Sequence, residues 1–125
     1  MMTTDIRIIR ARDFIRAIPS GELDFEKAKK ILIEIALKAE PLSNYEMILD
    51  MRKAEPLLSV TDIWTLATEL RNLLKSFAGR IAVLTPIQRF DRASFFALCA
   101  QNRGFKINAF TSYEDAIEWL IADAH

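Results

Sequence analysis

The chain has 125 residues, of which 17 are basic and 17 acidic, so its formal net charge at pH 7 is zero. This balance removes the broad positive field on which binding to DNA or RNA depends, and we expect no nucleic acid as a partner. The apolar fraction of 51% is enough for the core of one domain over residues 1–125.

Membrane and export signals are missing from the sequence. No segment approaches the roughly 20 apolar residues that a membrane-spanning helix needs, and the first ten residues lack the apolar run of a signal peptide. We therefore expect a cytoplasmic protein that does not span a membrane.

The N-terminal third predicts two short strands, in a hairpin or a bent meander, followed by a helix. Two short strand patterns within residues 5–18 turn near residues 11–13. Asp24 is placed to cap a helix that continues to about Ala39. On this helix Ile31, Ile33 and Leu37 widen the apolar stripe beyond one face, which indicates a contact with a further helix or another subunit.

The stretch from Asn44 to Arg71 reads as a strand, a loop and an amphipathic helix in direct succession. Apolar residues alternate with others from residue 45 to 52, as they do in a strand with one buried face. Ser59 and Asp62 then have the spacing of a capping box, and the apolar residues that follow lie on one helical face.

The C-terminal part continues the alternation of strand and helix. Residues 80–85 predict a strand, and a helix from about residue 91 to 103 is expected to point Phe95, Leu98 and Cys99 inward before it stops at Gly104. Residues 106–110 predict the last strand, and Ser112 opens a final helix. This order predicts an α/β fold, with a mainly parallel sheet of about five strands and about four helices gathered largely on one face.

Alternation also sorts the strand residues onto two faces of the sheet. One face is uniformly apolar, whereas the other is mixed and carries Ile48, Leu84 and Phe110. With the helices on the first face, little of this chain would cover these three residues. We therefore expect a homodimer, formed either by this face or by the stripe at residues 31–37.

Catalytic apparatus is not evident. The only histidine is His125, so no imidazole is placed for base catalysis or for a metal site. Gly21, Gly79 and Gly104 are too far apart for a phosphate-binding loop or a dinucleotide fingerprint. We predict no enzymatic activity, no metal and no cofactor, and we interpret Cys99 as a core residue.

Several segments together resemble a known family. FIRAIPSGELDFEKAKKIL, YEMILDMR, SVTDIWTLATEL, RIAVLTP and KINAFTSYEDAIEWL resemble the STAS domain of bacterial anti-sigma-factor antagonists. The chain is similar more closely still to their SpoIIAA-like, or STAS/SEC14, relatives. The resemblance covers about residues 5–120, and it implies a STAS-like domain that regulates by binding a protein.

In those antagonists the loop before the second helix carries a phosphorylated serine in an Asp-Ser-Ser-Gly-like motif. Here neither the acidic residue before nor the glycine after is present. Counting from the strand without a gap puts the switch serine on Ser59, which makes it a candidate for phosphorylation. Matching the helix periodicity puts the position on Val60, and Ser59 is then only a helix cap. We favour the second count because loops absorb insertions more readily than packed helices do.

The resemblance and the apolar loop together predict a binding module. Its expected partner-contact loop comprises Leu57, Leu58, Ser59, Val60, Thr61 and Trp64. The alternative, that these residues fold back onto the core, stays open. The STAS/SEC14 resemblance implies a second function, a small lipid or apolar-ligand module with a cavity lined by residues such as Phe14, Leu84 and Phe110.

Overall fold

The computed structural model describes residues 6–11, 14–39, 45–74 and 77–122. Its main sheet has five strands in the order β1-β2-β4-β6-β7. β1 pairs with β2 in antiparallel register, which confirms the predicted hairpin, and the other neighbours pair in parallel. The hairpin's turn lies outside the described residues. The strands are β1 (Ile6–Ala11), β2 (Phe14–Pro19), β4 (Glu46–Asp50), β6 (Arg80–Leu84) and β7 (Lys106–Phe110).

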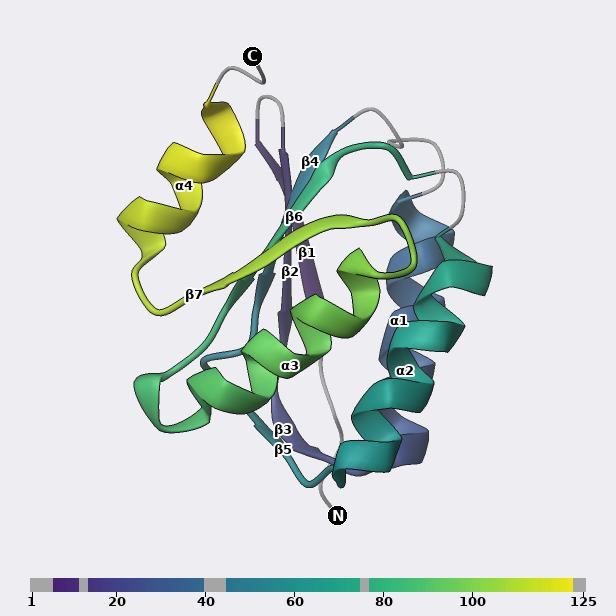
Figure 1. The fold of residues 1–125 in the computed structure, drawn as a ribbon. Coiled ribbons are helices and arrows are strands. Elements are labelled where there is room, and N and C mark those ends of the chain that lie inside the picture. The colour runs from purple at the N-terminus through teal and green to yellow at the C-terminus, as the bar shows by residue number, and fades with distance from the viewer. Residues whose placement is uncertain (1–5, 12–13, 40–44, 75–76, 123–125) are drawn as a thin grey trace.

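Three helices connect the parallel strands and cover one face of the sheet (Figure 1). They are α1 (Phe25–Ala39), α2 (Val60–Leu73) and α3 (Phe90–Gln101), the last preceded by the short 3-10 helix η2 (Ile87–Arg89). Each helix links a strand to the next strand along the sheet, always in the same direction. Right-handed crossovers therefore place all three helices on the same face. None of the described helices is long and apolar enough to cross a membrane.

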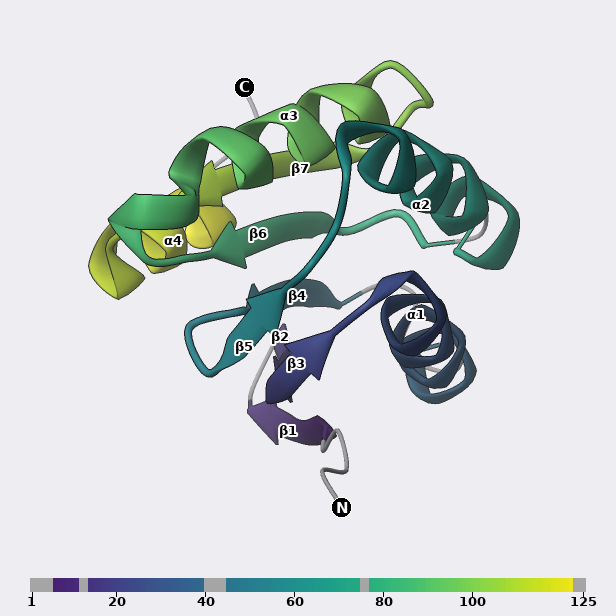
Figure 2. The ribbon, with the colours of Figure 1, turned by 90° about the horizontal axis from the view of Figure 1, so that it is seen from below.

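The fourth helix, α4 (Tyr113–Ile121), covers the opposite face (Figure 2). The expectation that this face lacks a cover is therefore wrong. Ile48 and Leu84 have no exposed surface and pack with Ala116 and Leu120 of α4. Phe110 is half-buried, because the ring of Trp119 lies against it with centroids 5.5 Å apart.

The main core lies between the sheet and α1, α2 and α3. One prediction for α3 is wrong: the Leu98 side chain is 53% exposed, while Cys99 is buried as expected and Phe95 is half-buried. The small residues Ala97 and Ala100 are the ones buried in the main core. Small side chains allow α3 to approach β7 closely, so a count of large apolar residues misjudged the inward face.

A second, two-stranded sheet was not predicted. β3 (Gly21–Leu23) and β5 (Ala54–Pro56) pair in parallel beside the main sheet. Each has only three residues, too few for a period of two to be seen in the sequence. This pairing is extended by Leu57, whose amide donates to the carbonyl of Leu23 at 2.8 Å.

The predicted helix caps are confirmed. The amide of Lys27 donates to Oδ1 of Asp24 at 2.9 Å, and the amide of Asp115 donates to Oγ of Ser112 at 3.3 Å. At the start of α2 the capping box is complete: the Asp62 amide donates to Ser59 Oγ, and the Ser59 amide donates to Asp62 Oδ2, both at 3.0 Å. Ser59 therefore fixes where α2 begins.

We expect Ser59→Ala to lower the free energy of unfolding by about 1 kcal/mol, because one amide of the first helical turn loses its acceptor. Ser59→Asp should stay within about 0.5 kcal/mol of wild type, since aspartate also caps and its charge lies at the helix N-terminus. Urea denaturation followed by circular dichroism measures both values. Thr61→Ala in the same turn is the control, and an equal loss for this variant would contradict the capping role.

Candidate functional site

The segment that enters α2 exposes three large apolar side chains. Leu57, Val60 and Trp64 are 54%, 58% and 52% exposed, and Ser59 and Thr61 are exposed as well. Val60 and Trp64 are four residues apart on α2, so they lie on the same side of the helix. This part of the predicted contact loop lies at the surface and faces solvent.

Leu58 departs from the rest of the loop. Its side chain is half-buried and packs against the main core, so for Leu58 the structure fits the alternative in which the loop folds back onto the core. Leu57 and Leu58 are consecutive residues of an extended segment and point to opposite sides of it. Leu58 thereby anchors the loop, while Leu57 stays outside.

Trp64 is held in place by Arg103, which lies just after α3. The guanidinium carbon of Arg103 lies 4.9 Å from the centre of the Trp64 ring, within the range of a cation–π contact. The same guanidinium donates to Thr68 Oγ1 at 3.1 Å and to the carbonyl of Cys99 at 2.7 Å. Arg103 therefore fixes the orientation of the exposed Trp64 ring.

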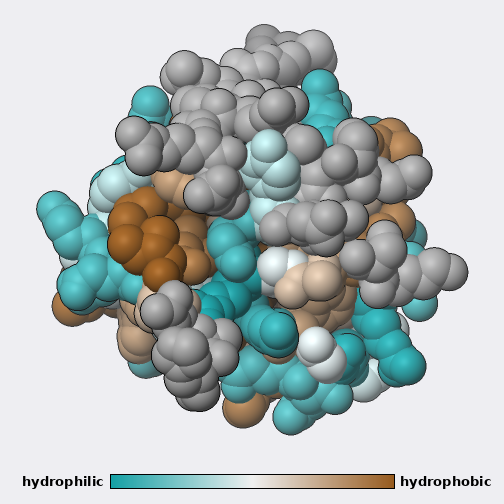
Figure 3. Space-filling model, turned by 90° about the horizontal axis from the view of Figure 1, so that it is seen from above, coloured by the Kyte–Doolittle hydropathy of each residue, from teal (hydrophilic) through white to brown (hydrophobic). Residues whose placement is uncertain are grey.

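Other exposed large apolar residues are spread over the molecule. Figure 3 shows the apolar surface on one face as separate patches among hydrophilic residues. These other residues lie on the helices and on η2: Ile33, Leu37, Ile87, Leu98 and Ile121. Among the described residues, the segment from Leu57 to Trp64 is thus where three such side chains come closest in sequence.

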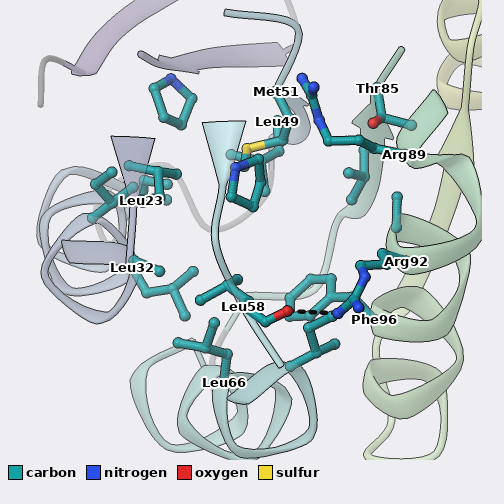
Figure 4. Close-up of a pocket in the computed structure, with 18 residues that line it drawn as sticks. Leu23, Leu32, Leu49, Met51, Leu58, Leu66, Thr85, Arg89, Arg92 and Phe96 are labelled. Atoms are coloured by element: carbon teal, nitrogen blue, oxygen red, sulfur yellow. Dashed lines mark hydrogen bonds between the residues drawn. The ribbon is translucent and has the colours of Figure 1, made fainter. Parts of the chain in front are cut away.

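A pocket of about 120 Å³ opens between α1, α2, α3 and the sheet (Figure 4). Its walls are mostly apolar: Pro19, Leu23, Ala28, Ile31, Leu32, Ile35, Leu49, Met51, Pro56, Leu58, Ile63, Leu66, Val83, Ala93 and Phe96, with Thr85, Arg89 and Arg92 as the polar members. Phe14, Leu84 and Phe110, the predicted lining of a cavity, do not line this pocket. The prediction chose the wrong face of the sheet, because Leu84 and Phe110 pack with α4.

No local sequence signal could have located this pocket. Its lining residues come from nine different elements and the loops between them, and are separated by up to 77 positions, from Pro19 to Phe96. Each of the apolar ones reads in the sequence as an ordinary core residue. Only the arginines stand out, since charged side chains seldom line apolar cavities without a partner.

A buried carboxylate lies at the end of β4, outside the pocket. Asp50 is 2% exposed and accepts from Arg16 Nη2 at 2.8 Å and from Arg52 Nη2 at 2.9 Å. Burial by itself would raise the pKa of Asp50, but the hydrogen bonds from Arg52 and Arg16 outweigh it and hold the pKa at about 2. The same pair raises the pKa of Arg52.

This cluster ties two neighbouring strands together. Arg16 lies in β2 and Asp50 in the adjacent β4, and Arg16 also lies over the Tyr113 ring at 5.2 Å. These contacts join β2 to β4 and to Tyr113 at the start of α4, which indicates a structural role. The described residues contain no cluster of three or more His, Cys, Asp or Glu side chains that could hold a metal ion.

The low pKa of Asp50 predicts a pH dependence of stability. Because the folded pKa lies below the unfolded one, the unfolded state binds more protons between them, and stability falls as the pH drops from about 4 to 2. Asp50→Asn should be destabilised by about 2 kcal/mol at pH 5.5, and this gap to wild type should nearly close at pH 2. Urea denaturation of both proteins at the two pH values measures the gap, and a gap of the same size at both would contradict it.

No protein-family model and no curated protein sequence matches the chain. Solved structures do match. An anti-sigma factor antagonist from Mycobacterium paratuberculosis is 17% identical with a TM-score of 0.65, and 96% of each chain is covered. An uncharacterized protein of the DUF3478 family from Shewanella loihica PV-4, described as having a SpoIIAA-like fold, is 18% identical with a TM-score of 0.60 over 94% of this chain and 93% of that one.

The anti-sigma factor antagonist SpoIIAA in its unphosphorylated form is also similar. It is 15% identical with a TM-score of 0.52, over 97% of this chain and all of that one. These TM-scores establish the fold, whereas identities this low say nothing of the function. The chain therefore has the STAS-like fold of the SpoIIAA-like structures and anti-sigma factor antagonists, as the sequence resemblance predicted.

Proposed function

We propose that this protein is a non-enzymatic regulatory module of the cytoplasm that acts by binding a protein partner. The contact surface would be formed by Leu57, Ser59, Val60, Thr61 and Trp64, with Leu58 as its anchor. The observation that carries this proposal is the exposure of three large apolar side chains on a segment fixed by a capping box and a cation–π contact. Interface hot spots are enriched in Trp, Tyr and Arg, and Trp64 with Arg103 over its ring supplies two of these residue types.

The similarity to anti-sigma factor antagonists supports the class of function. We infer that the usual phosphoserine switch is not used. The hydroxyl of Ser59 already caps α2, and the flanking residues Leu58 and Val60 replace the acidic residue and the glycine of the antagonist motif. If the switch were present, Ser59 would be the residue that is phosphorylated.

Trp64 is the residue to test. A partner captured by the wild-type protein and identified by mass spectrometry is titrated against purified variants by calorimetry. We expect Trp64→Ala to weaken binding about 30-fold or more, the effect of losing one hot-spot side chain. Val60→Asp should also weaken binding while leaving the fold intact, because an acidic residue suits the first turn of a helix.

The matched control is Ile87→Ala. Ile87 is 76% exposed, lies on η2 outside the contact loop, and loses a comparable apolar surface when truncated. Melting temperatures of all variants exclude unfolding as the cause of weaker binding. Equal weakening by Ile87→Ala, or none by Trp64→Ala, would refute the contact loop.

A second candidate function, binding of a lipid or other apolar ligand, rests on the pocket of Figure 4. The pocket is lined almost entirely by apolar side chains and opens to the surface beside three helices. A cavity of about 150 Å³ with such a lining stays dry and binds benzene, so a pocket of about 120 Å³ has room for a small hydrocarbon group.

We also propose a homodimer, and α1 is the surface through which it would form. The sheet face that the sequence offered for it is covered by α4, and Ile31 is buried within this chain. Ile33 and Leu37 are 38% and 69% exposed and are four residues apart, so two copies of α1 could pack along this stripe. Sedimentation equilibrium should show a dimer at tens of micromolar protein that Leu37→Asp converts to monomer, and a monomeric wild-type protein would refute it.

A further inference from the structure

The polar groups of the pocket all lie on one wall. Thr85 follows β6, Arg89 ends η2 and Arg92 lies in the first turn of α3, while the opposite walls from α1 and α2 are apolar (Figure 4). The pocket is thus amphipathic: it offers a hydrocarbon environment with two positive charges at one side. A purely apolar ligand would have no use for this arrangement.

The two arginines have hydrogen-bonding capacity to spare. Arg89 Nη2 donates to the carbonyl of Ala54 at 2.7 Å, and Arg92 Nη1 donates to the carbonyl of Leu58 at 2.5 Å. These contacts hold the segment from β5 to α2 across the pocket. A guanidinium has five N–H donors, and each arginine uses one in a hydrogen bond to another described residue.

Their charges lack a counterpart. Neither Arg89 nor Arg92 forms an ion pair with a carboxylate in the described parts of the chain, whereas Arg16 and Arg52 share Asp50. In addition, Nε of Arg89 is buried and has no hydrogen-bond partner there. A buried donor without an acceptor costs free energy, and a bound anion would remove that cost.

We propose that this pocket binds a fatty carboxylate, with the hydrocarbon chain among the apolar walls and the carboxylate at the guanidinium group of Arg89, whose buried Nε lacks an acceptor among the described residues. The planar fork of a guanidinium matches a carboxylate. The cavity volume suits a single short chain and excludes the two chains of a membrane lipid. This inference rests on the second candidate function, binding of an apolar ligand, and specifies its head group.

The test compares sodium octanoate with 1-octanol, two probes with the same chain length and different head groups. Isothermal titration of the wild-type protein should give octanoate a dissociation constant about tenfold or more below that of octanol, because its bonds to guanidinium are charge-assisted. Arg89→Gln should bring this ratio close to one, whereas Arg92→Gln should lower it less, because the Arg92 guanidinium lies by Leu58 and away from that of Arg89 (Figure 4). Octanol binding to the variants shows that the pocket still forms.

Two further variants control the result. Arg71→Gln removes an exposed arginine of α2 outside the pocket and should leave the ratio unchanged. Ala93→Leu fills the pocket beside Arg92 and should weaken both probes. If Arg89→Gln and Arg92→Gln do not fold, the ratio in the wild-type protein decides alone.

The outcomes separate the two proposals. Octanol binding as tightly as octanoate to the wild-type protein would overturn the carboxylate assignment and leave apolar-ligand binding standing. The carboxylate assignment is likewise overturned if Arg71→Gln lowers the ratio of the two dissociation constants as much as Arg89→Gln does. If neither probe binds the wild-type protein, both the second candidate function and this inference fail.

Discussion

The structure depends on burying both faces of its two central parallel strands. Ile48, Ala82 and Leu84 have no exposed surface on one face, and Met47 and Ile81 are 2% exposed on the other. Because successive side chains of a strand point to opposite faces, β4 and β6 would expose one apolar row if either layer were missing. Helices α1, α2 and α3 supply one layer and α4 supplies the other. The short α4 thus closes a core that the three longer helices cannot reach.

The pocket follows from how the three helices divide their face. They pack over the middle of the sheet, while the β3 and β5 pair and the segment leading into α2 bridge the space near the strand ends. In that segment Leu58 faces the pocket and Leu57 faces solvent. A single stretch of chain therefore separates the proposed ligand site from the proposed partner site, and Arg92 holds it by the carbonyl of Leu58. A ligand in the pocket would therefore lie beside Leu58, the anchor of the contact loop.

Two pairs of arginines differ in the groups that they bind. Arg16 and Arg52 share the carboxylate of Asp50, and their hydrogen bonds offset the cost of burying it. Arg89 and Arg92 are partnered by carbonyl groups alone among the described residues, beside an apolar cavity. The first pair neutralises a buried carboxylate within the protein, which accounts for its contribution to stability. The second leaves charge for a ligand, which is why the inference of an anionic head group rests there.

The sequence by itself determined the local elements. Period-two strands, the capping box at Ser59 and the N-cap at Asp24 predicted where β4, α2 and α1 form, because hydrogen bonds and side-chain periodicity within a few residues decide them. With the strand order that the structure gives, the rule of right-handed crossovers accounts for three of the four helices on one face. It could not place α4, since no strand follows that helix to make a crossover. The side of α4, the outward turn of Leu98 and the pocket were decided by the tertiary structure, because each depends on packing between residues far apart in the chain.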